Sequence, residues 1–79
     1  MNKQRRSEIE LVKKNISLIK DDLRRIQDEE QFSFDNMPEN LQSSERGLNS
    51  ENSIDIMEET IELLEDAISN LNSIFWEVI

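Results

Sequence analysis

The chain has 79 residues, of which 18 are Asp or Glu and 9 are Lys or Arg, so its formal net charge at pH 7 is −9. It contains no cysteine and no histidine, which excludes disulfides and makes a zinc site implausible. Because a chain this short buries only about 60% of the surface that its unfolded form exposes, we expect self-association to supply part of its stability.

The first half of the sequence predicts one long helix over about residues 5–35. Apolar residues recur there at alternating spacings of three and four, which places them on one stripe of a helix that turns about 100° per residue. The stripe consists of Ile9, Val12, Ile16, Ile19, Leu23 and Ile26. We expect this seam to face a mate helix, as the a and d positions of a coiled coil do.

The stretch FDNMPENLQSSERG, residues 34–47, interrupts the pattern and holds the only proline and the only glycine. Pro38 cannot continue a helix, so the first helix should end just before it, and residues 38–43 can form a short helical turn. The residues expected to end that turn are Ser43, Ser44 and Gly47. The predicted connector therefore spans residues 36–49.

The second half predicts another helix over about residues 50–78, capped by Ser50 or Ser53, whose hydroxyls can accept orphan amide hydrogens. Its seam consists of Ile54, Met57, Ile61, Leu64, Ile68, Leu71, Phe75 and Val78. Residues 1–25 hold eight basic residues against four acidic ones, whereas residues 49–79 hold eight acidic residues and no basic one. An antiparallel hairpin, which lays the basic start beside the acidic distal part, is therefore favoured.

Further apolar residues lie beside the two seams. They are Leu11 and Leu18 in the first helix and Ile56 and Leu63 in the second. A lone hairpin leaves such residues in water, so we expect them to form the interface of a homodimer, or of a higher homo-oligomer. The predicted fold is all-α, an antiparallel two-helix hairpin that dimerises into a four-helix bundle. The alternative is that these four residues are scattered surface apolar residues, which are common.

Two interpretations of the connector stay open. In one, the apolar residues Phe32, Phe34, Met37 and Leu41 cover the end of the bundle as a lid, and the polar residues cap helix ends. In the other, the connector binds a nucleotide-like ligand through a stacking ring, several amides and hydroxyls, and an arginine. The candidate ligand-binding residues are Phe34, Asn36, Asn40, Gln42, Ser43, Ser44 and Arg46.

The connector, preceded by DEEQ and followed by MEETIELLEDAISNLNSI, resembles a family of small, largely uncharacterised proteins of phages and prophages of Gram-positive bacteria. The resemblance covers about residues 20–74, and the tail IFWEVI is more apolar than that family's usual pattern. It implies a phage setting, in which small proteins without catalytic residues often block bacterial defence by binding an enzyme or sequestering a nucleotide signal.

Enzymatic function is not expected, because no nucleophile motif is present and the sequence lacks a histidine base. Glu58, Glu62 and Glu65 have a spacing that can hold magnesium, but the first helix offers no matching pair, so we interpret them as a solvated acidic face. No catalytic residue, metal or cofactor is predicted. The acidic charge argues against direct nucleic-acid binding, and the acidic polar faces argue against membrane binding.

The expected function is that of a non-enzymatic binding protein in the cytoplasm of the bacterial host cell. It would act in counter-defence, either by sequestering a nucleotide-like signal at the connector or by blocking a host defence protein. The alternative is an acidic helical interaction module, or a nucleic-acid mimic, that acts through its outer surface.

Overall fold

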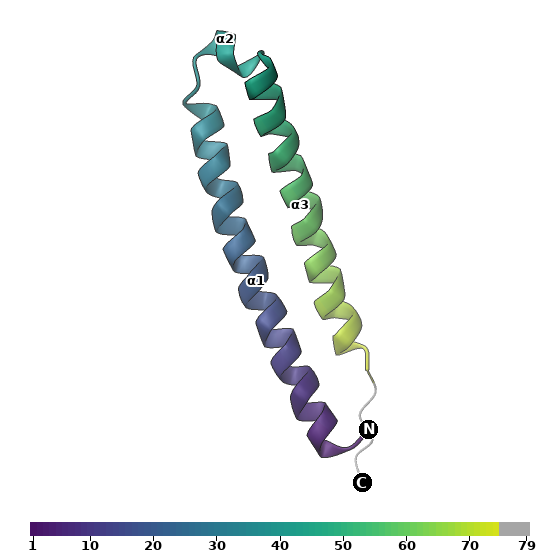
Figure 1. Ribbon diagram of the computed structural model, residues 1–79. Coiled ribbons are helices and arrows are strands. Elements are labelled where there is room, and N and C mark those ends of the chain that lie inside the picture. Colours follow the sequence, from purple (N-terminus) through teal and green to yellow (C-terminus); the bar gives the residue numbers. More distant parts are fainter. Residues whose placement is uncertain (75–79) are drawn as a thin grey trace.

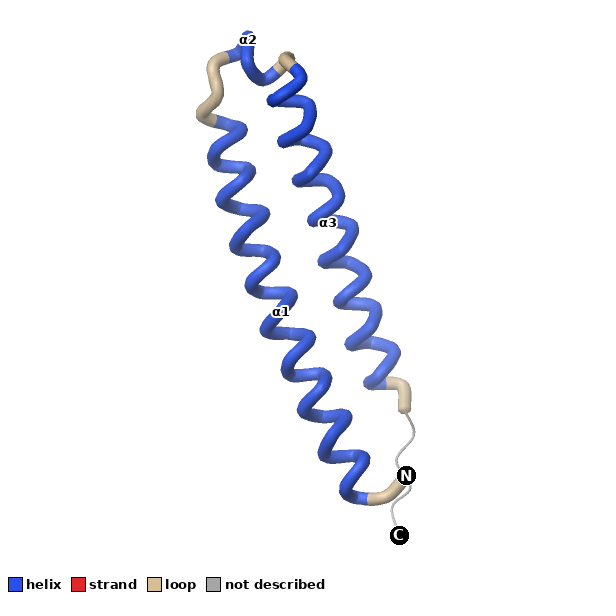
Figure 2. Tube along the Cα trace, in the orientation of Figure 1, coloured by secondary structure: helices blue, strands red, loops and turns tan. Residues whose placement is uncertain are grey.

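The computed structural model describes residues 1–74, and the regular secondary structure of this range is entirely helical (Figure 1). Helix α1 runs over Lys3–Asp35, α2 over Glu39–Gln42 and α3 over Glu45–Asn72. The two long helices pack side by side and antiparallel, and α2 forms the turn that joins them at one end (Figures 1 and 2). The result is a rod with extents of 64 × 15 × 12 Å.

Local capping explains where α1 begins and ends. The side chain of Asn2 accepts a hydrogen bond from the backbone amide of Arg5 at 2.8 Å, as a good N-cap residue does. At the other end Asn36 caps the helix, and its side-chain Nδ2 donates to the carbonyl oxygen of Phe32 at 2.7 Å. Pro38 follows two residues later and becomes the N-cap of α2, so the predicted helical turn after the proline is present.

Helix α3 begins earlier than the sequence predicts. Its N-cap is Ser44, whose hydroxyl accepts from the amide of Gly47, and not Ser50 or Ser53. The expectation that Gly47 helps to end the helical turn of the connector was wrong, because this glycine lies buried within the first turns of α3. A side chain there would overlap the carbonyl oxygens of α2, so glycine is needed for close approach rather than for a turn.

The other end of α3 lies at Asn72, with Ser73 as its C-cap. The predicted extension to about residue 78, the seam residues Phe75 and Val78, and most of the IFWEVI tail lie outside the described residues. None of the described helices combines the length and the apolar character that crossing a membrane requires.

The hydrophobic core between the long helices is narrow. In α3, Ile61 is fully inaccessible and Ile54 is buried, in line with the predicted seam. The α1 seam was predicted only in part. Ile9, Ile16 and Leu23 lie half-buried against α3, whereas Val12, Ile19 and Ile26 remain exposed.

This difference has a physical reason in the neighbouring polar residues. The inward side of α1 is completed by Lys13, Lys20 and Gln27, which are half-buried or buried. These side chains reach acceptors on α3, so α1 is rotated toward them and away from its second apolar row. A helix with two apolar rows can face a single mate with only one of them.

Candidate interaction surface

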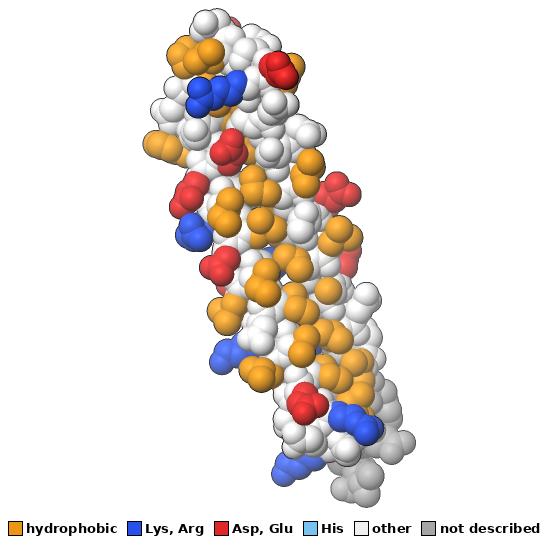
Figure 3. Space-filling model, viewed as in Figure 1, with side chains coloured by type: hydrophobic (Ala, Val, Ile, Leu, Met, Phe, Trp, Pro, Cys, Tyr) orange, Lys and Arg blue, Asp and Glu red, His pale blue; other side chains and the backbone are white. Residues whose placement is uncertain are grey.

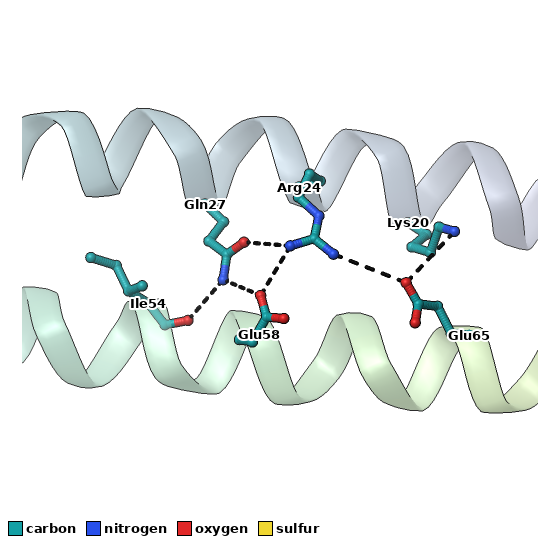
Figure 4. A network of polar contacts seen from close by, with 6 residues as sticks. All are labelled: Lys20, Arg24, Gln27, Ile54, Glu58 and Glu65. Carbon is teal, nitrogen blue, oxygen red and sulfur yellow. Dashed lines mark hydrogen bonds and ion pairs between the residues drawn. The ribbon is translucent and has the colours of Figure 1, made fainter.

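Polar contacts fasten one side of the seam between the helices. The guanidinium of Arg24 lies 3.0 Å from Oε2 of Glu58, and Nζ of Lys20 lies 3.9 Å from Oε1 of Glu65 (Figure 4). Gln27 is buried and donates from Nε2 to the same Glu58 oxygen at 2.8 Å (Figure 4). The antiparallel arrangement that the charges favour is present, and these contacts pair basic residues of α1 with acidic residues of α3.

The other side of the seam carries an exposed apolar surface. Its residues, which we call the apolar face, are the exposed Val12, Ile19 and Ile26 of α1 together with the exposed Ile56 and Leu63 at the edge of α3. Each is between 45% and 60% exposed. Figure 3 shows apolar side chains running along both helices on one face of the rod. In α1, Lys20 follows Ile19 by one residue, so its side chain points about 100° away from that of Ile19. The ion pairs and the apolar face therefore lie on opposite sides of the seam between the helices.

The four residues predicted to form a dimer interface are all exposed, at 59% for Leu11, 55% for Leu18, 54% for Ile56 and 60% for Leu63. In helical offset they are equivalent, because Ile56 and Leu63 precede the α3 seam residues Met57 and Leu64 by one residue. Leu11 and Leu18 precede Val12 and Ile19 by one residue and therefore lie about 100° farther round α1, at its outer edge. The apolar spacing predicts that Val12, Ile19 and Ile26 lie in the seam within the hairpin. The signal that could have placed them outside it is the row of polar residues at the inward positions, above all Gln27.

The polar residues predicted to bind a ligand at the connector mostly serve the backbone. Gln42 donates to the carbonyl oxygen of Phe34 at 3.0 Å, Ser43 donates to that of Glu39 at 3.2 Å, and Ser44 donates to that of Leu41 at 2.5 Å. Asn36 caps α1, as described above, and Asn40 is exposed on α2.

Arg46 is the member of that set that lines a depression. The depression has a volume of about 290 Å³ and is formed by Glu30, Ser33, Met37, Arg46, Asn49, Ser50 and Ser53. The hydroxyl of Ser50 donates to Oε1 of Glu30 at 2.6 Å across the seam, so the depression is fixed from both long helices.

The interpretation of the connector as a lid fits some of the four apolar residues assigned to it and not others. Phe34 and Met37 are half-buried at the connector, whereas Phe32 is 72% exposed and Leu41 is 38% exposed. Phe32 instead borders a larger depression of about 610 Å³ along the outer side of α1, with Asp21, Arg24, Arg25, Asp28 and Glu29. Phe32 therefore does not cover the end of the hairpin.

Among the described residues, no group of His, Cys, Asp and Glu is arranged to hold a metal ion. Comparison with known proteins finds no family model, no curated protein and no solved structure that matches the chain.

Proposed function

We propose that this chain is a non-enzymatic binding protein whose folded unit is a homodimer, in which the apolar faces of two hairpins meet to form a four-helix bundle. The observation that carries the proposal is the apolar face itself. Five large apolar residues on one face are about half-exposed or more, while Ile54 and Ile61 are the apolar residues that the hairpin buries within residues 1–74. Covering such a face removes apolar surface from water, which is the main favourable term in association.

The surface area supports a partner of about the size of a second hairpin. A compact monomer of 9.3 kDa exposes about 5,000 Å² by the scaling of folded proteins. The chain exposes 6163 Å², an excess of roughly 1,200 Å². A stable interface buries about 800 Å² on each partner, so the excess is large enough for one.

We further propose that the bundle binds a protein rather than a nucleotide. The connector was the expected nucleotide site, and all of its candidate amide and hydroxyl side chains except that of Asn40 already donate to nearby backbone carbonyl oxygens. A ligand would have to compete with those hydrogen bonds. In the phage setting that the sequence resemblance implies, the expected partner is a host defence protein.

Sedimentation equilibrium tests the dimer. The wild-type chain should sediment as a dimer, and Ile19→Glu, which puts a charge in the middle of the apolar face, should give a folded monomer or a strongly weakened dimer. Ser69→Glu is the matched control, because it adds the same charge at an exposed position of α3 in a row with Asp55 and Glu62. A wild-type monomer that melts cooperatively would exclude the proposal.

A further inference from the structure

The apolar face becomes polar at its connector end. Side chains seven residues apart share one side of a helix, and two such rows run along this face. The rows consist of Val12, Ile19, Ile26 and Ser33 in α1, and of Arg46, Ser53, Thr60 and Ala67 in α3. Ser33, Ser53 and Arg46 line the same depression, which shows that the two rows adjoin at this end of the face. The depression is therefore part of the surface that a second copy would cover.

Arg46 and Glu30 carry opposite charges into this depression without pairing inside the hairpin. Both residues line it, yet the ion pairs formed within residues 1–74 do not include Arg46. Arg46 is also the only basic residue in the sequence after Arg25. An arginine that forms no ion pair within its own hairpin is left to find a carboxylate on the covering molecule.

We propose that the second copy completes this depression, with Arg46 of each subunit facing Glu30 of the other. The two hairpins pack face to face with both connectors at the same end, around a twofold axis that runs along the rod. This inference rests on the proposed dimer and adds its orientation. The site is incomplete in one chain, because each Arg46 takes its carboxylate from the second copy.

The same-end orientation follows from the pattern along the face. A twofold axis along the rod keeps every residue at its own level and lays α1 on the partner's α3. The apolar part of one subunit's face then contacts the apolar part of the partner's face. The polar connector ends of the two faces also contact each other. Arg24 is level with Glu58, and residue numbers run in opposite directions along the two antiparallel helices. Ile26 therefore lies near the level of Ile56, and Ile19 near that of Leu63, so large apolar residues of both helices fall in the same layers.

The opposite-end orientation brings like charges together. In this orientation α1 would lie antiparallel on the partner's α1, and the edge of α1 beside the apolar face would contact the same edge of the partner's α1. In α1 the row on that edge, between the apolar face and the outer edge, consists of Glu8, Asn15, Asp22 and Glu29, all of them exposed. Three of these four are acidic, and placing the row beside its own copy is unfavourable. In the same-end dimer this row lies beside the partner's Ile56, Leu63 and Asn70, which carry no charge.

Distances between spin labels test the orientation. The chain has no cysteine, so Asn40→Cys provides a single labelling position on the exposed surface of α2. In the same-end dimer the two labels should lie roughly 20 to 35 Å apart, the span of two neighbouring helix pairs plus the label arms. In the opposite-end dimer they should approach the 64 Å length of the rod.

Ser7→Cys, on the exposed start of α1, is the matched control at the other end of the rod. Same-end dimers give short distances for each variant alone and a long distance for mixed dimers of the two variants. Opposite-end dimers give the reverse. The long distance in a single-variant dimer overturns the orientation and leaves the proposed dimer standing, whereas a monomeric wild type in sedimentation overturns both.

Charge reversal tests the pairing of Arg46 with Glu30. Arg46→Glu should raise the dissociation constant of the dimer by about threefold to thirtyfold, since it replaces an attraction with a repulsion. Adding Glu30→Arg to that variant should restore most of the affinity, which damage to the fold alone would not do. Lys14→Glu, which makes the same charge change on the exposed surface away from this depression, should leave the affinity unchanged. Equal affinities for wild type and Arg46→Glu would overturn the pairing.

Discussion

Nε2 of Gln27 lies 2.8 Å from Oε2 of Glu58, so a buried amide on α1 donates to a carboxylate on α3 across the middle of the hairpin. The same nitrogen lies 3.3 Å from the carbonyl oxygen of Ile54. Arg24 approaches the same Glu58 oxygen at 3.0 Å (Figure 4). This small network sets the register of the two helices, because sliding either helix by one turn would leave a buried amide without acceptors.

The first prediction follows from that network. Gln27→Ala should lower the free energy of unfolding by about 1 to 3 kcal/mol, because it removes buried packing and leaves Glu58 with one donor fewer. The measurement is the midpoint of urea unfolding at constant protein concentration, since a dimer's midpoint depends on concentration. Gln31→Ala is the control, because Gln31 is exposed and bonds only within its own helix, to Asp35. Equal midpoints for both variants would show that the network contributes little.

Much of the hairpin could be predicted because its strongest signals are local. Pro38 fixes the end of α1 through the missing amide hydrogen, and the charge difference between the two halves favours the antiparallel direction. The start of α3 could not be predicted in the same way. From the sequence alone, Gly47 is expected to break a helix. Only the contact with α2 shows that its missing side chain makes room for carbonyl oxygens.

The rotation of α1 escaped prediction for a different reason. Apolar spacing identifies Ile16 and Ile19 as members of one broad stripe, but it does not say which edge of the stripe a single mate helix will cover. The choice is made by Lys20 and Gln27, whose acceptors lie on α3. Such pairings join residues far apart in the sequence and become visible only in the folded hairpin.

The second prediction concerns Gly47. Glycine to alanine inside a helix usually stabilises a protein by about 1 kcal/mol. Here the new methyl group would overlap backbone oxygens of Leu41 and Gln42, which cannot rotate away, so we expect a loss of about 2 to 4 kcal/mol. Thermal unfolding followed by circular dichroism measures the change, and Asn52→Ala, at an exposed position in the same helix outside the depression that Arg46 lines, provides the control. A higher melting temperature for Gly47→Ala would contradict the close approach of α2 and α3.

The third prediction separates a protein-binding role from nucleotide sequestration. A ligand that binds only the folded form raises the melting temperature, by an amount that corresponds to about 2.7 kcal/mol at a hundredfold excess over its dissociation constant. Because most of the polar connector side chains already bond to the backbone, cyclic and linear nucleotides at millimolar concentration should leave the melting temperature unchanged. A rise that is lost in Asn40→Ala would instead establish the connector as the ligand site. Asn40 suits this test because its side chain is exposed on α2.

The fourth prediction compares two neighbouring residues. Leu18 and Ile19 are 55% and 56% exposed, so loss of solvent contact within the hairpin does not distinguish them. They point about 100° apart, Ile19 on the apolar face and Leu18 at the outer edge of α1. In a four-helix bundle made from two apolar faces, Ile19→Glu buries a charge between subunits and should raise the dissociation constant at least a hundredfold, since burial of an unpaired charge costs several kcal/mol. Leu18→Glu leaves its charge near solvent and should raise the constant less than tenfold. Sedimentation equilibrium across a range of concentrations measures both, and equal effects would mean that the interface wraps round α1 to include Leu11 and Leu18, in an assembly broader than a four-helix bundle.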